Sequence, residues 1–296
     1  MAFTESNNTK PMRCFLSLMC MYVLSLNSFG QYFECQELKS YDVGVQPDSI
    51  DHIDAFDCPE LLSMSLLSKT LSLRIAAKDL ISFDLCGAAR LKDLYLEGTL
   101  EVVPECVENL VVLNVNLDND GAALFRKRFD KLEHMSLAVN EPVILDSLVA
   151  NLDNFPVLWS FWLHDYTGDL HRVSSIWSLD RVKQLSLVTD SGYRVLPDNF
   201  ASESIQTMTI SMDYDYATKI DWKTRFPNLE DITIYTSRVE NFRDGFENLA
   251  GVESIKIGVN LNLNLEDDLK IWDDLQRDVW YLRAEYDVDV VLSLAR

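Results

Sequence analysis

The stretch that decides the fold is Phe129-Asp130-Lys131-Leu132-Glu133-His134-Met135-Ser136-Leu137. Its aliphatic residues Leu132, Met135 and Leu137 follow the pattern aliphatic-x-x-aliphatic-x-aliphatic, in which x stands for any residue. Apolar residues at every second position are typical of a short strand that buries one face. The stretch therefore predicts such a strand, with a further apolar residue, Phe129, in the turn that precedes it.

The same pattern occurs eight times in clear form, and every aliphatic position in the eight copies is apolar. The middle aliphatic residues are Leu94, Leu113, Met135, Phe161, Leu185, Met208, Ile232 and Ile255. They are 19, 22, 26, 24, 23, 24 and 23 residues apart, close to a repeat period of about 20 to 29 residues. One copy is too short to bury its apolar face alone, so we expect the copies to stack into one domain.

Two further positions recur around the pattern. Six residues before the middle aliphatic, six copies have an apolar residue, namely Val107, Phe129, Phe155, Leu179, Phe226 and Leu249. Three residues after the last aliphatic, the side chains are able to form hydrogen bonds, and all but one are small: Thr99, Asp118, Asn140, Tyr166, Asp190, Asp213, Ser237 and Asn260. We expect this second position to point inward and to bind main-chain groups of neighbouring coils.

These features resemble the leucine-rich-repeat family from about residue 85 to residue 260. The resemblance implies an α/β fold, a right-handed solenoid with a parallel sheet on its concave side and short helices or turns on its convex side. Weaker copies extend the pattern toward the N-terminus, at Leu61/Met64/Leu66 and Leu38/Tyr41/Val43. The solenoid is therefore expected to cover residues 31–264.

Residues 265–296 are expected to cap the solenoid, because an open end would expose its apolar core. Leu265, Leu269, Trp272 and Leu275 lie near one face of a predicted helix. Residues 279–282 and 288–292 are rich in apolar side chains, and we expect them to form closing strands.

Residues 1–30 allow two interpretations. Lys10 and Arg13 precede a largely apolar run over residues 14–26, and the small residues Ser28 and Gly30 follow it, as in a secretory signal peptide. The run also fits a first buried strand of the solenoid. If the segment is removed, four cysteines remain, Cys35, Cys58, Cys86 and Cys106, an even number that suits disulfides near the N-terminal edge. If it stays, reduced thiols are expected.

Charge narrows the classes of partner. The chain has 26 basic and 47 acidic residues and a net charge of -21. Nucleic acid is not an expected partner, because binding a phosphate backbone requires a basic surface. A basic protein partner suits the acidic surface better. No run reaches the roughly 20 apolar residues that span a bilayer, so no integral membrane span is expected.

Motifs for enzymatic chemistry are missing from the sequence. The four histidines are dispersed, and neither a phosphate-binding glycine loop, nor a nucleophile elbow, nor a paired-cysteine zinc pattern occurs. Residues 118–121 resemble the start of a calcium loop, but Phe129 stands where such a loop has its bidentate Glu. We therefore expect no enzyme activity, no cofactor and no metal site.

The outward strand residues are the expected binding surface. Most of them are small and polar, whereas Trp162 is a large aromatic residue that should lie between Ser136 and Ser186 on the neighbouring strands. Large aromatic residues often dominate the free energy of binding at protein interfaces. We predict a partner-binding site at Trp162, supported by His164, Tyr95 and Tyr235. The other interpretation has Trp162 packed on its neighbours or under a loop.

The sequence therefore predicts a non-enzymatic scaffold that binds a protein partner on its concave face. One hypothesis is an intracellular adaptor or substrate receptor, similar to irregular leucine-rich-repeat proteins of ubiquitin ligases, although no F-box pattern is recognisable in the first 55 residues or so. The alternative is a secreted leucine-rich-repeat recognition protein. The sequence does not decide between these hypotheses, so the protein is expected to be either cytoplasmic or secreted.

Overall fold

The computed structural model describes 40–41, 52–55, 63–65, 70–76, 82–98, 103–117, 119–139, 141–166, 170, 174–177, 179–189, 192–193, 196–237, 239, 242–261 and 263–294. The predicted signal peptide at residues 1–30 lies outside these residues. So do Cys35 and Cys58.

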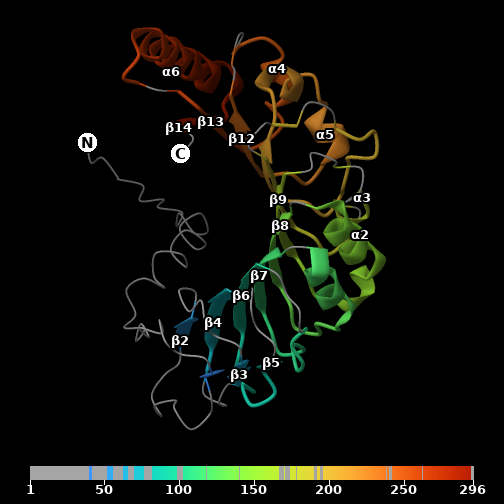
Figure 1. Ribbon diagram of the computed structural model, residues 1–296. Helices are drawn as coiled ribbons and strands as arrows, with labels where there is room; N and C mark the ends of the chain where they lie inside the picture. The colour runs from blue at the N-terminus through green and yellow to red at the C-terminus, as the bar shows by residue number, and fades with distance from the viewer. Residues whose placement is uncertain are drawn as a thin grey trace, which may run out of the picture.

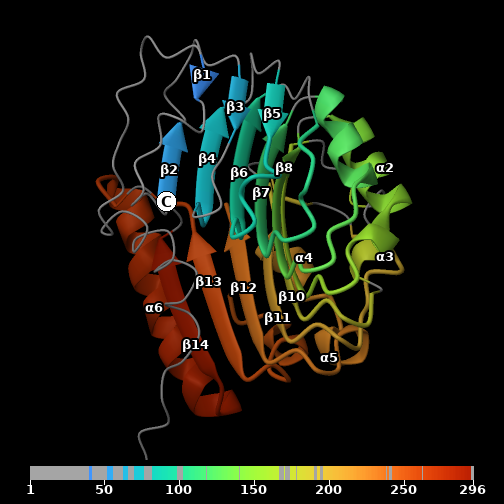
Figure 2. The same cartoon turned by 90° about the horizontal axis from the view of Figure 1, so that it is seen from below.

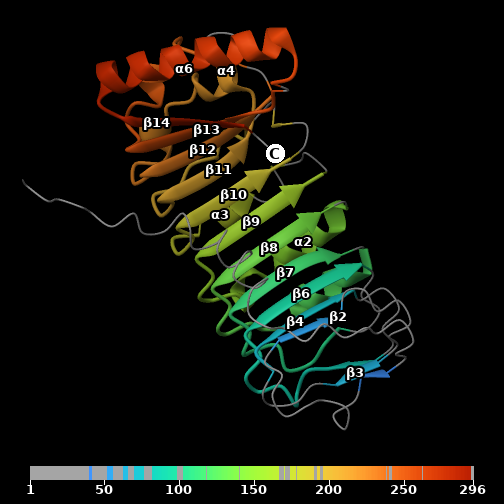
Figure 3. The same ribbon diagram turned by 90° about the vertical axis from the view of Figure 1, so that its left-hand side faces the viewer.

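A single large sheet organises the fold. Its strands are β2 (His52–Ala55), β4 (Ser72–Ala76), β6 (Asp93–Gly98), β7 (Val112–Leu117), β8 (His134–Val139), β9 (Ser160–Asp165), β10 (Gln184–Val188), β11 (Thr207–Ser211), β12 (Asp231–Thr236), β13 (Ser254–Val259) and β14 (Asp289–Leu294). They lie side by side in chain order, and every neighbouring pair is parallel. Figure 3 shows this succession. The predicted α/β class with a parallel sheet is confirmed.

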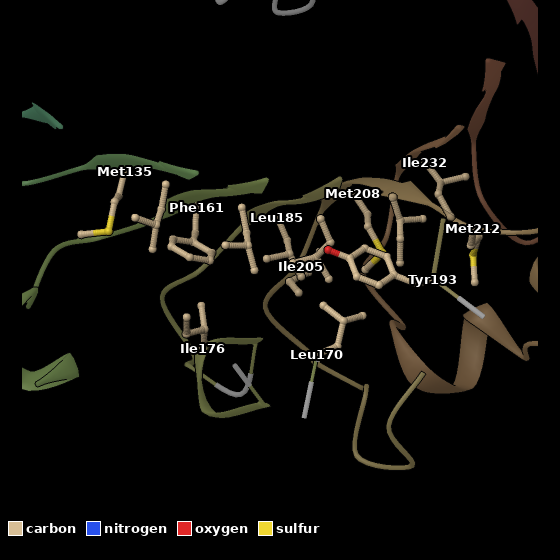
Figure 4. Close-up of a cluster of buried hydrophobic side chains, with 14 of the residues drawn as sticks. Met135, Phe161, Leu170, Ile176, Leu185, Tyr193, Ile205, Met208, Met212 and Ile232 are labelled. Atoms are coloured by element: carbon tan, nitrogen blue, oxygen red, sulfur yellow. The ribbon is translucent and has the colours of Figure 1, made fainter. Parts of the chain in front are cut away.

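The aliphatic pattern forms the core of the protein. All 24 residues of the eight triplets are buried. The middle residues are aligned across the sheet, so that Leu113 pairs with Met135, Met135 with Phe161, and Phe161 with Leu185. Figure 4 shows part of this apolar row from Met135 to Ile232. Because side chains alternate between the two faces, a shift by one residue in any strand would expose its apolar set.

Short helices follow several strands and cover the outer side of the curved sheet, as Figure 1 shows for α2, α3 and α5. The described helices between β7 and β13 are η2 (Asn119–Arg126), α2 (Pro142–Ala150), η3 (Leu152–Asn154), α3 (Ser174–Trp177), α4 (Tyr214–Ala217), α5 (Trp222–Arg225) and η5 (Phe246–Asn248). Helix α2 begins at Pro142, whose ring is compatible with a first helical turn. Buried Ile144, Leu145 and Leu148 pack it onto the core.

The N-terminal strands differ from the prediction. Tyr41 and Met64 belong to a second sheet, made of β1 (Ser40–Tyr41), β3 (Ser63–Ser65) and β5 (Ser82–Asp84), and not to the main sheet. The main sheet instead contains β2 and β4, in which Ile53 pairs with Leu73 and Leu73 with Leu94. The pattern around Leu73 was missed because the buried Thr70 takes its first aliphatic position.

The inward position that follows each strand also differs from the prediction. Tyr166, Asp213, Ser237 and Asn260, three residues after the last aliphatic, are exposed. The inward position lies one residue earlier, where Val139, Asp165, Thr189, Met212, Thr236 and Val259 are buried. Each strand continues its alternation for one more step, so the second residue after the last aliphatic points inward and the third points outward.

The C-terminal segment contains one long helix, α6 (Glu266–Tyr286), followed by β14. The expectation of a strand at 279–282 was wrong, because Val279 and Leu282 lie on the buried face of α6 with Leu275. Leu265 and Leu269 are exposed, contrary to the predicted helical face. Figure 2 shows α6 alongside β14, at the end of the sheet. The helix donates from Arg283 Nε to the carbonyl of Val290, 2.7 Å away.

Candidate protein-binding surface

Trp162 lies in the outward row of the main sheet, at β9. It pairs in register with Ser136 on β8 and with Ser186 on β10, as the sequence predicted. Trp162 is 37% exposed, although strands flank it on both sides. The small neighbours explain this exposure, because neither serine reaches far enough to cover the ring.

Tyr95 lies in the same outward row on β6. In the register, Asn114 and Ser136 lie between Tyr95 and Trp162. Tyr95 and Trp162 are therefore three strands apart, or about 14 Å. The guanidinium of Arg74 stands over the Tyr95 ring, 5.1 Å from its centre. The Tyr95 hydroxyl donates to Glu97 Oε2 at 3.0 Å. These contacts hold the ring in place and occupy one of its faces.

Tyr235 lies three strands beyond Trp162 in the other direction, on β12, but in the next outward row. Its Cα pairs with Ser211 on one side and Gly258 on the other. The ring leans over Gly258, because a Cβ added to that glycine would stand 2.4 Å from Cδ1 of Tyr235. The three predicted aromatic residues therefore mark one face of the sheet without touching one another.

His164 is half-buried and stacks on Tyr166, with ring centres 4.3 Å apart and an angle of 29° between the planes. A hydrogen bond of 3.3 Å joins the Tyr166 hydroxyl and Nδ1 of His164. Tyr166 is 49% exposed, and sequence reasoning missed it as a surface residue. Strict alternation along β9 would have found it, since it follows the inward Asp165.

A second pair of rings lies where β8 and β9 begin. His134 packs against Trp159 with ring centres 4.5 Å apart, and Trp159 donates from Nε1 to Glu133 Oε2 at 3.3 Å. Burial lowers the pKa of His134, although the carboxylates of Glu133 and Asp93 act in the opposite direction. The pair is close to Trp162 in the sheet. His134 is on β8 with Ser136, and Trp159 directly precedes β9, which contains Trp162.

Within the described part of the chain, no group of three or more His, Cys, Asp or Glu residues could hold a metal ion. The helices in that part include none that is long and apolar enough to cross a membrane. The surface around Trp162 instead presents hydroxyl, amide and aromatic groups. Such groups can pack against and form hydrogen bonds with another chain.

A disulfide joins Cys86 and Cys106, whose Cα atoms are 5.0 Å apart. It links the turn after β5 to the segment in which Glu105 forms a bridge with Asp84 of β5. The amide of Cys86 donates to Asp84 Oδ1 at 2.8 Å. The sequence left the state of these cysteines open between disulfides and reduced thiols, and the structure pairs Cys86 with Cys106.

The comparisons with known proteins find no family model, no curated protein and no solved structure that matches this chain.

Proposed function

We propose that this chain is a leucine-rich-repeat protein, a right-handed solenoid that binds a protein partner on its concave face and has no catalytic role. The support for the repeat is the alignment of the eight middle aliphatic residues in one buried row, at intervals of 19 to 26 residues. The curved sheet with helices on its outer side agrees with this architecture.

The observation that carries the binding function is the exposure of Trp162 at the middle of an open sheet face. An aromatic ring that stays exposed does not gain the free energy of burying its apolar surface. A protein partner that packs on the ring would bury that surface, so the position of Trp162 suits a binding site. Tyr95 stands about 14 Å to one side in the same outward row, and Tyr235 stands three strands to the other side in the next row. A partner that crosses the strands would meet all three rings in succession.

A secreted recognition protein is favoured over an intracellular adaptor by one observation, the Cys86–Cys106 disulfide. Disulfides persist in oxidising compartments and are rare in the cytosol. The adaptor remains the second candidate and would require both thiols to be reduced. Mass spectrometry of the protein from its source, with and without alkylation before reduction, separates the two. Alkylation of Cys86 and Cys106 without prior reduction would contradict secretion.

The binding function is tested by comparing two tryptophan variants as baits. Trp162→Ala removes the ring on the sheet, and Trp280→Ala removes a ring on α6 that is 67% exposed. Proteins from the source are captured with each bait and quantified by mass spectrometry. We expect at least one protein to be retained by the wild type and by Trp280→Ala but lost with Trp162→Ala. Equal recovery with all three baits, each folded by circular dichroism, would contradict the proposal.

A further inference from the structure

Exposed apolar side chains gather on the C-terminal helix. Among the described residues, eleven large apolar side chains are exposed, and five of them lie on α6 or directly before it: Leu265, Leu269, Ile271, Trp280 and Tyr281. Trp280 is the most exposed of the eleven, at 67%. Single exposed apolar residues are common on protein surfaces, whereas several on one helix indicate an interaction site.

Three of these residues form one stripe along α6. Leu269 and Trp280 are eleven residues apart, which is about three helical turns. The amide of Leu269 donates to the carbonyl of Leu265 at 3.0 Å, so Leu265 stays in line with the first turn. Asp273 and Gln276 are exposed and lie between Leu269 and Trp280 on the same side. We call Leu265, Leu269, Asp273, Gln276 and Trp280 the α6 stripe.

The α6 stripe is not the side of the helix that packs on the fold. That side consists of the buried Leu275, Val279 and Leu282, about a third of a turn away from the stripe. Tyr281 is on another side again, where the guanidinium of Arg243 covers its ring at 4.4 Å from the centre. Figure 3 shows α6 as the last element at one end of the sheet. The stripe therefore has its apolar surface in solvent at the end of the protein.

The charges of α6 determine how a second copy of the helix could lie beside it. Residues 266–274 include five acidic side chains and one basic, whereas residues 275–286 include two of each. Two copies of α6 that run in the same direction would place two acidic halves together. Two antiparallel copies place each acidic half beside a neutral half. Since like charges repel, the antiparallel arrangement is favoured.

In that arrangement the α6 stripe is complementary to itself. With a twofold axis between residues 274 and 275, Leu269 of each copy lies opposite Trp280 of the other, and Asp273 lies beside Arg277 of the other. Arg277 now pairs with Asp274 at 3.1 Å, and both side chains are more than half exposed. Such a pair is weak, so Arg277 can turn to Asp273 of the second copy. By symmetry, each contact is made twice.

We propose that the chain forms a twofold dimer in which the α6 stripes of two copies pack against each other in antiparallel orientation. This inference goes beyond the binding function of the Trp162 surface and does not depend on it. From Leu265 to Trp280 the stripe is about 22 Å long. A contact of that size is small, so the dimer is weak and forms in the micromolar range. Physiological salt screens the repulsion between two chains of net charge -21.

Sedimentation velocity of the full chain at physiological salt, from about 1 to 100 μM, measures the dimer. We expect the wild type to change from monomer to dimer over this range. Leu269→Ala should weaken the dimer at least about tenfold, because two leucines leave the interface. Ile271→Ala is the matched control, since Ile271 is exposed on the opposite side of α6, and it should leave the dissociation constant unchanged. A monomeric wild type, or equal weakening by the two variants, would overturn the inference.

A charge exchange tests the antiparallel pairing itself. Asp273→Arg places two arginines against each other at the interface, and Arg277→Asp places two aspartates there, so each variant alone should be monomeric. An equimolar mixture of the two should form a heterodimer, because every aspartate then faces an arginine. Circular dichroism checks that each variant is folded. A mixture that stays monomeric, or single variants that dimerise like the wild type, would contradict the proposed interface.

Discussion

The ring of Tyr235 lies against Cα of Gly258 on the neighbouring strand. A Cβ built on Gly258 would be 2.4 Å from Cδ1 and 2.7 Å from Cε1 of this ring. The two residues are paired in register, and both belong to the outward side of the sheet. The glycine therefore provides the space that allows an aromatic ring to lie flat beside the proposed binding surface.

Gly258→Ala should force the Tyr235 ring away and destabilise the protein by about 1 to 3 kcal/mol, in the range of overpacked sites. Urea unfolding measures the change. Gly251→Ala is the matched control, because its Cβ would be 3.4 Å from the flexible Lys223 side chain, and we expect a change within about 0.5 kcal/mol. In Tyr235→Ala the cost of Gly258→Ala should disappear, since the ring is gone. A cost that persists there would show that the ring is not its cause.

Neighbouring residues on β9 should respond very differently to truncation. Phe161 is fully buried and Trp162 is exposed on the opposite face. Phe161→Ala should lower the free energy of unfolding by about 3 to 5 kcal/mol. Trp162→Ala should lower it by less than about 1 kcal/mol. Chemical denaturation of both variants checks the strand register, and comparable losses would contradict the orientation of β9.

The Cys86–Cys106 disulfide should stabilise the folded protein, because it lowers the conformational entropy of the unfolded chain. The two residues are 20 positions apart, and closing a loop of that length restricts the unfolded state by about 3 kcal/mol. The double variant Cys86→Ala/Cys106→Ala should therefore unfold at lower urea concentration than the oxidised protein. Reduced wild type should unfold close to the double variant. No difference between oxidised and reduced protein would mean that the bond does not form in solution.

His134 should make stability depend on pH. Burial lowers the pKa of His134 below its ordinary value of 6.5, so the unfolded chain binds a proton more readily than the folded protein. Stability from this residue is complete above pH 6.5 and declines as the pH falls toward the folded pKa. His134→Gln should flatten the pH dependence of urea midpoints in this range. Titration of the histidine ring by NMR gives the folded pKa, and a value above 6.5 would reverse the sign.

The central part of the sheet could be predicted from sequence because it depends on a local pattern. Each triplet, such as Leu132, Met135 and Leu137, places its side chains on one face of a strand, and eight copies at similar intervals require eight stacked strands. The same alternation placed Trp162 between Ser136 and Ser186. On a regular strand, the odd or even position of a residue is enough to predict which face of the sheet its side chain points to.

The ends of the sheet depended on contacts distant in sequence. At the N-terminal end, the short apolar runs around Met64 and around Leu73 look alike, yet β3 joins the small sheet and β4 the large one. At the C-terminal end, residues 279–282 have strand-like composition but continue α6, because Val279 and Leu282 lie about one helical turn apart on the buried face of that helix.

The sequence by itself determined the recurring aliphatic pattern, the buried row that it forms and the outward position of Trp162, since the last two follow from side-chain alternation along a strand. Only the tertiary structure decided that Cys86 meets Cys106, that Tyr235 lies over Gly258, and that Glu230 and Glu253 become neighbours. The physical reason is that the two residues of each pair are 20 to 23 positions apart in the chain. They come together only when the chain turns back after one strand and the next strand pairs beside it.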